Sequence, residues 1–177
     1  GGALIGFLLA ARWLTRGMDP YRMAARGILG GIAAFSCVIF AAPMDSTVVF
    51  YTGAFGIGFG GGLFGISTLT AAMTMPARGL AGAGLALGAW GAAQATAAGL
   101  AILIGGTLRD VVSHLATAGK LGALTDASIG YSAVYHLEIG LLFATLVVLG
   151  PLVKVGILTP PKPDADGGKL ALAEFPT

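Results

Sequence analysis

Charged residues are scarce in this chain, and their scarcity excludes a water-soluble fold. They make up 10% of the 177 residues, whereas soluble domains carry about 25%. Arg78 is the only charged residue between Asp45 and Arg109, so a long uncharged run lies on each side of one short basic turn. A helix needs about 20 apolar residues to cross a bilayer, and helices satisfy their own backbone hydrogen bonds there. The sequence therefore predicts an all-α membrane protein.

Other absences exclude several functions. Cys37 is the single cysteine, so the chain cannot build a disulfide framework or a cysteine metal site. No span contains paired carboxylates or a nucleophile with a base in reach, so we expect no catalytic residues and no enzyme activity. Asp164 and Asp166 are interpreted as solvated charge rather than as metal ligands. The net charge of +2 is too small to indicate a nucleic-acid partner.

Apolar runs between charged residues predict five membrane-spanning helices. They cover approximately residues 1–14, 24–42, 47–74, 80–106 and 131–153. The first is short and opens in the middle of an apolar stretch, so we interpret it as the cut end of a longer chain. Residues 1–155 would form one transmembrane bundle. The tail 156–177 is rich in proline and glycine and is expected to be flexible.

The basic residues indicate an orientation. With five crossings, Arg109 and Lys120 fall on one side. The other eight fall on the opposite side: Arg12, Arg16, Arg22, Arg26, Arg78, Lys154, Lys162 and Lys169. The positive-inside rule then makes the side with eight basic residues cytoplasmic, and the C-terminal tail with it.

Residues 107–121 carry apolar and polar side chains on opposite helical faces. Thr107 and Asp110 have the spacing of a capping box after Gly105 and Gly106. We therefore expect a separate helix lying flat on the membrane surface, either as a connector or as a binding helix.

Thirty glycines would weaken soluble helices, but in lipid they let helices approach closely. The third span has Gly56 with Gly60 and the fourth has Gly84 with Gly88, at the spacing of small-xxx-small pairs. We expect these two helices to pack tightly. The cluster at 58–62 fits either close packing or a bend in a transporter.

Aromatic residues in the spans are candidates for contacts with a pigment or a partner. Tyr51, Phe55 and Phe59 form a stripe that could meet lipid, a pigment ring or another helix. Trp90 lies too deep for an interfacial belt, so it should pack within the bundle or against a ligand.

Polar residues within the spans are few, and they include Gln94, Thr96, His136 and Glu138. Glu138 could couple protons, anchor a helix to Gln94 or a threonine, or stay hydrated near the surface. His136 could ligate the magnesium of a chlorophyll or donate a hydrogen bond near the interface. About 200° of helical rotation separates the two side chains, so they cannot form one site.

Three segments carry a family resemblance. They read Gly-Leu-Ala-Leu-Gly-Ala-Trp-Gly-Ala-Ala-Gln-Ala-Thr-Ala-Ala-Gly at 84–99, Gly-Gly-Thr-Leu-Arg-Asp at 105–110, and Tyr-His-Leu-Glu-Ile-Gly-Leu-Leu-Phe-Ala-Thr at 135–145. This pattern resembles the C-terminal half of the PucC/LhaA family of phototrophic bacteria. The basic loop from Gly6 to Arg26 is similar to a loop of major facilitator transporters, except that Ala10 stands where those proteins usually carry an acidic residue.

The resemblance implies a major-facilitator-like helical bundle in the bacterial inner, intracytoplasmic photosynthetic membrane. Members of that family assist the assembly of light-harvesting complexes and are thought to handle bacteriochlorophyll. The implied partners are light-harvesting polypeptides and the reaction centre complex. Two alternatives stay open: a proton-coupled secondary transporter that uses Glu138, and a structural subunit that stays bound in a photosynthetic complex.

Overall fold

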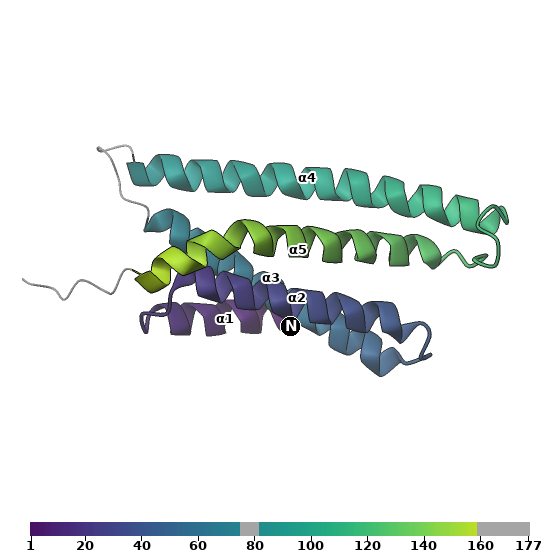
Figure 1. The fold of residues 1–177 in the computed structure, drawn as a ribbon, viewed down its shortest axis with the longest axis horizontal. Helices are drawn as coiled ribbons and strands as arrows, with labels where there is room; N and C mark the ends of the chain where they lie inside the picture. Colours follow the sequence, from purple (N-terminus) through teal and green to yellow (C-terminus); the bar gives the residue numbers. More distant parts are fainter. Residues whose placement is uncertain (75–81, 159–177) are drawn as a thin grey trace, which may run out of the picture.

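The regular structure is helical throughout the described residues. The computed structural model describes residues 1–74 and 82–158. Its helices are α1 (Gly2–Leu14), α2 (Pro20–Ala41), α3 (Thr47–Met73), α4 (Gly82–Thr117) and α5 (Ile129–Leu158) (Figure 1). The predicted all-α membrane fold is confirmed. The predicted tail lies largely outside the described residues, as do Arg78, Lys162 and Lys169.

Four of the helices are long and apolar enough to cross a membrane, namely α2, α3, α4 and α5. Helix α1 has 13 residues and is about 20 Å long at 1.5 Å per residue. This is shorter than the roughly 30 Å of hydrocarbon in a bilayer. Of the five expected spans, the first thus contributes a helix of 13 residues to this sequence.

Helix α2 begins earlier than its apolar run, because a cap and a proline set its start. The Asp19 carboxylate accepts a hydrogen bond of 2.8 Å from the Arg22 backbone N–H, and Pro20 occupies the first helical position. Both features favour a helix N-terminus. The expected start at residue 24 is thus too late, since Arg22 already lies in the helix.

Glycines bring α2 and α3 together at backbone distance. A Cβ atom built on Gly27 would lie 2.7 Å from the carbonyl oxygen of Gly60, and one on Gly60 would lie 2.7 Å from the oxygen of Gly27. Gly56 meets Ala34 of α2 in the same way. Such contacts need residues without side chains. The α2–α3 contact is the most extensive in the described structure.

Other glycines of α3 hold α1. A Cβ on Gly58 would lie 3.1 Å from the Ala3 nitrogen, and one on Gly62 would lie 2.5 Å from the Ala3 oxygen. The glycine cluster at 58–62 therefore supplies close packing on two sides. Helix α3 runs through it without interruption.

The expected tight packing is found at Gly56 and Gly60 of α3, but the expectation is wrong for Gly84 and Gly88 of α4. A Cβ on Gly84 or Gly88 would meet nothing within 4 Å. Helix α4 lies at the edge of the bundle beside α5 and touches α3 much less (Figure 1). The physical reason is that α1 and α2 already occupy the glycine surfaces of α3.

The separate surface helix expected at 107–121 is also wrong, because α4 continues unbroken to Thr117. The loop before α5 supports this extension: the Ser113 hydroxyl donates a 2.8 Å hydrogen bond to the Ala127 carbonyl. Asp110 forms an ion pair with the neighbouring Arg109 instead of a capping box. With 36 residues, α4 is about 54 Å long and exceeds the bilayer core.

Candidate functional site

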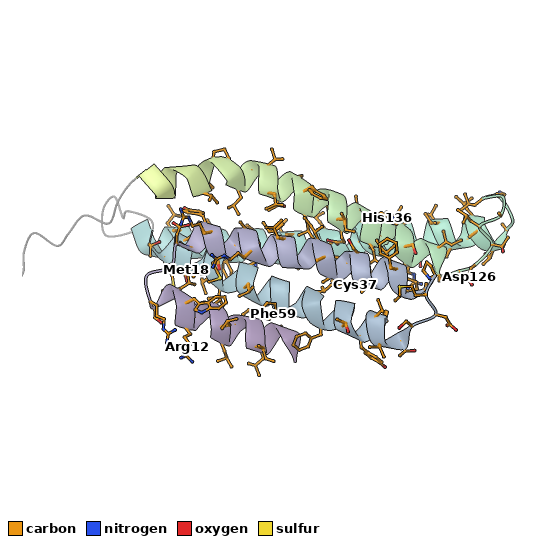
Figure 2. All side chains as sticks on the ribbon, turned by 60° about the horizontal axis from the view of Figure 1, so that its bottom comes forward. Arg12, Met18, Cys37, Phe59, Asp126 and His136 are labelled. Carbon is orange, nitrogen blue, oxygen red and sulfur yellow. The ribbon has the colours of Figure 1, made fainter. Side chains whose placement is uncertain are left out.

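Charged side chains lie at the two ends of the bundle. Arg12, Arg16, Arg22 and Arg26 belong to the α1–α2 end, and Figure 2 shows Arg12 and Asp126 at opposite ends of the molecule. Lys120 and Asp126 lie in the α4–α5 turn, and Arg109 lies in the part of α4 beside Tyr131 of α5. The chain is thus a multi-pass protein whose connections alternate between two ends. Which end faces the cytoplasm stays a prediction from the charge asymmetry.

A cavity of about 470 Å³ lies at the Asp45 end, between the α2–α3 turn and the start of α5. Three tyrosines, Tyr51, Tyr131 and Tyr135, line it together with Phe50. Its polar lining comes from Asp45, Ser46, Thr47, Ser128 and Ser132. Of the candidate residues from the sequence, only Tyr51 is in this cavity. Tyr131 and Tyr135 were not candidates. The sequence signal that could have found them is the position of tyrosines near the ends of spans, where such rings lie between water and lipid.

Contacts from neighbouring helices fix the aromatic walls of this cavity. The Arg109 guanidinium lies 5.1 Å from the centre of the Tyr131 ring, and its Nη1 donates a 3.3 Å hydrogen bond to the Tyr131 hydroxyl. The Tyr135 ring lies 5.8 Å from that of Phe35 in α2. These contacts join α2, α4 and α5 around one site.

The loop before α5 is ordered by a carboxylate. The Ser128 backbone N–H donates a 2.6 Å hydrogen bond to Asp126 Oδ1. This bond, reinforced by the Ser128 side chain, holds the pKa of Asp126 below its usual value because it stabilises the ionised form. Since Ser128 lines the cavity, the Asp126 turn also positions one of its walls.

The aromatic stripe of α3 does not form one surface. Tyr51 lines the cavity, whereas Phe59 packs against the core cluster of Ala10, Met23 and Leu63. Phe55 is exposed between them. The three evenly spaced aromatic residues thus lie in three different environments, because α1 covers only part of that face of α3.

Trp90 joins α4 to α3, whereas Gln94 and Thr96 point away from any hydrogen-bond partner that the described residues offer. The Trp90 indole Nε1 donates a 3.3 Å hydrogen bond to the Thr68 hydroxyl, and its ring is partly buried. Gln94 and Thr96 are exposed. All residues from 92 to 104 are exposed, so the middle of α4 presents an open apolar face.

His136 and Glu138 lie in different surroundings on α5. His136 is exposed, and its Nδ1 lies 2.7 Å from the Ser132 carbonyl oxygen. Glu138 is half-buried, and none of the described residues forms an ion pair or hydrogen bond with its carboxylate. The anchor to Gln94 or a threonine, one of three roles left open for Glu138, is therefore not formed in this part of the chain.

These features define a class: multi-pass helical membrane proteins. The family model described as PUCC protein matches residues 1–157. The chain belongs to this family, and the resemblance found in its motifs is confirmed. No solved structure matches the chain significantly, so the major-facilitator-like arrangement stays a prediction.

Several relatives from photosynthetic bacteria are similar to the chain. A protein of Rhodobacter capsulatus described as lying in the puhA-bchM intergenic region is 57% identical over 176 residues, covering 99% of this chain and 36% of the relative. Protein PucC of Cereibacter sphaeroides is 45% identical over 154 residues, covering 87% of this chain and 32% of that protein. Protein PucC of Rhodovulum sulfidophilum is 51% identical over 112 residues, covering 63% and 24%. The chain thus spans about a third or less of these relatives' length.

Proposed function

We propose that the chain forms part of a membrane-embedded assembly factor for bacterial light-harvesting complexes. Membership of the PUCC family and the relatives named PucC support a role linked to these complexes. The expected place of work is the photosynthetic membrane. The partners are light-harvesting polypeptides and the reaction centre complex.

The open face of α4 is the observation that carries this proposal. Gly88, Gly91 and Gly99 leave space where a side chain would otherwise stand, because most of α4 has no neighbouring helix among residues 1–74 and 82–158. Leu103 and Ile102 stand beside them and are 65% and 78% exposed. In lipid, a second helix approaches most closely over small residues. This face therefore suits a newly inserted membrane-spanning polypeptide.

Copurification tests the proposal. An affinity-tagged copy of the complete protein, expressed in a phototrophic bacterium that lacks its own, should copurify with light-harvesting polypeptides while complexes are being made. Deletion of the gene should lower the amount of assembled complex. Unaltered assembly after deletion, together with no copurification, would contradict the proposal.

A role in handling bacteriochlorophyll is supported by the surroundings of His136. Its Nδ1–H is engaged with the Ser132 carbonyl, which leaves the lone pair of Nε2 for the magnesium of a pigment. Gly140, one turn further along α5, leaves open space on the same side. A flat macrocycle fits such a surface. The bound pigment would absorb light, and His136 would hold and orient it.

An absorption spectrum of the purified protein tests this role. Bacteriochlorophyll should be retained by the unaltered protein and lost from His136→Ala. His114→Ala changes another exposed histidine, on α4, and should retain the pigment. Equal amounts of retained pigment in the two variants would show that His136 is not the ligand.

Proton-coupled transport is the competing function, and the observation that favours it is the carboxylate of Glu138, which has no partner among the described side chains. A half-buried carboxylate in a membrane helix is costly unless it finds water or a partner, and such groups often carry protons. A flux assay on the complete protein would compare it with Glu138→Gln. Loss of uptake with intact assembly would reverse our order of the two functions.

A further inference from the structure

We propose that the cavity beside Asp45 binds the headgroup of a zwitterionic phospholipid, a role that goes beyond the assembly function proposed above. Phosphatidylcholine and phosphatidylethanolamine share the necessary chemistry. Each joins a cationic ammonium group to an anionic phosphate near the glycerol backbone. The cavity and its rim offer a separate contact for each part.

The cavity is suited to an ammonium group by its aromatic walls. Phe50 and Tyr51 come from α3, and Tyr131 and Tyr135 come from α5. Several aromatic side chains around one volume form the arrangement by which proteins hold ammonium ligands, because ring faces attract cations. The volume of about 470 Å³ leaves room for a trimethylated nitrogen.

The charge of the ammonium group is matched by Asp45. Asp45 belongs to the cavity lining, and no ion pair with it occurs in the described residues. Asp45 adopts a φ of 46° in the α2–α3 turn. Its backbone N–H donates a 3.1 Å hydrogen bond to the Ala42 carbonyl. Aspartate tolerates this conformation better than most residues, so the turn holds a carboxylate at the cavity.

The phosphate is matched by Arg109, which contacts the cavity wall from outside. Its guanidinium lies over the Tyr131 ring, and only its Nη2 is used in the 2.7 Å ion pair with Asp110. The side chain is 45% exposed. Because a guanidinium has five N–H donors, several are left for phosphate oxygens. Arg109 on Tyr131 and Asp45 in the cavity lining thus offer one charged contact for each charge of the headgroup.

A lipid, rather than a soluble amine, is the occupant that this position favours. The cavity lies at the ends of the membrane-spanning helices, at the level where headgroups lie. Next to it, Met44 and Val48 are 62% and 75% exposed. These apolar side chains offer a surface for the glycerol and acyl region, which a free amine would leave uncovered.

Calorimetric titration of the purified full chain in detergent tests the proposal. The probes are short-chain phosphatidylcholine, phosphatidylethanolamine and phosphatidylglycerol, with choline chloride as the soluble amine. Both zwitterionic lipids should bind. Phosphatidylglycerol and choline should bind at least about tenfold more weakly, because each lacks one of the two charges.

Two matched pairs of variants locate the site. Asp45→Asn keeps a residue that accepts the left-handed turn, and Tyr51→Leu changes a side chain that is already 68% exposed, so both should fold. Each should weaken binding of the zwitterionic lipids about fivefold or more. Asp19→Asn, which keeps the cap of α2 at the other end of the bundle, and Phe55→Leu lie outside the cavity and should bind as the unaltered chain does.

Three results would overturn the proposal. Equal binding of phosphatidylglycerol would show that the ammonium group is not recognised. Choline binding as tightly as phosphatidylcholine would assign the cavity to a soluble amine. No loss of affinity in Asp45→Asn, with size-exclusion profiles unchanged, would place any lipid site elsewhere.

Discussion

Helices α3 and α4 are both rich in glycine at four-residue spacing, but they use it in opposite ways. In α3, Gly60 brings the backbone of α2 to contact, and Gly62 does the same for α1. In α4, a Cβ atom added to Gly84 or Gly88 would have no neighbour within 4 Å. The comparison teaches that one sequence pattern can make a closed core or leave an open surface. Neighbouring helices decide which of the two results.

The largest expected effect is on the closed side. Gly60→Leu should destabilise the protein by about 3 kcal/mol or more, because its side chain would overlap Gly27 and Gly31 of α2. Thermal unfolding in detergent measures the loss. Gly88→Leu is the matched control, and its free energy of unfolding should lie within about 0.5 kcal/mol of that of the unaltered chain. Equal destabilisation by both substitutions would show that the glycines of α3 and α4 are packed alike.

Gly88→Leu, the control for stability, should have a large effect on partner binding. Gly88→Leu should reduce copurification of light-harvesting polypeptides about tenfold, because it fills the gap over which a partner helix would pack. Quantitative immunoblotting of the purified complexes measures it. Leu29→Ala changes an exposed position on α2 and should leave the yield unchanged. A normal yield from Gly88→Leu would mean that the partner binds elsewhere.

A moderate effect is expected at Trp90, which joins α4 to α3. Trp90→Phe removes the hydrogen bond to Thr68 and should cost about 1 kcal/mol. Hydrogen exchange should rise in α4 more than in the α1–α3 core. Thr96→Val, at an exposed position of α4, serves as control. A uniform rise in exchange over all five helices would show that α4 is not an independent unit.

The smallest effect concerns pH at the α4–α5 turn. The pKa of Asp126 is lower in the folded chain than its usual value of 3.8. The stabilisation of the turn by ionised Asp126 is therefore complete above a pH of 3.8. It is lost as the pH falls through the lower pKa of the folded chain. The protection of residues 118–128 against hydrogen exchange, measured relative to the intrinsic exchange rate at each pH, should fall below about pH 4. Asp126→Asn should abolish this pH dependence, and its persistence would assign it to another group.

The helices could be predicted because their signals are local. Long uncharged runs predict α3 and α4, and Asp19 followed by Pro20 is a readable start signal for α2. The length of α4 could not be read from its own residues. Ser113 and Ala127 hold its last turns through a contact with the loop before α5, and such contacts are invisible to periodicity.

The site was less predictable than the fold for the same reason. Tyr51 was a candidate as one member of an aromatic stripe, but its role depends on Tyr131 and Tyr135, which belong to another helix. Gly84 and Gly88 had the spacing of packing residues, yet spacing does not show whether a neighbour is present. The roles of His136 and Glu138 stay predictions that require pigment and flux measurements.

Site-specific photocrosslinking tests the central claim most directly. A photoreactive amino acid placed at Leu103, on the open face of α4, is activated in membranes that are assembling light-harvesting complexes. Our account predicts adducts with light-harvesting polypeptides from Leu103 and none from the equally lipid-accessible Leu29 on α2. Adducts from both positions, or adducts from Leu103 only within the same polypeptide, would contradict it.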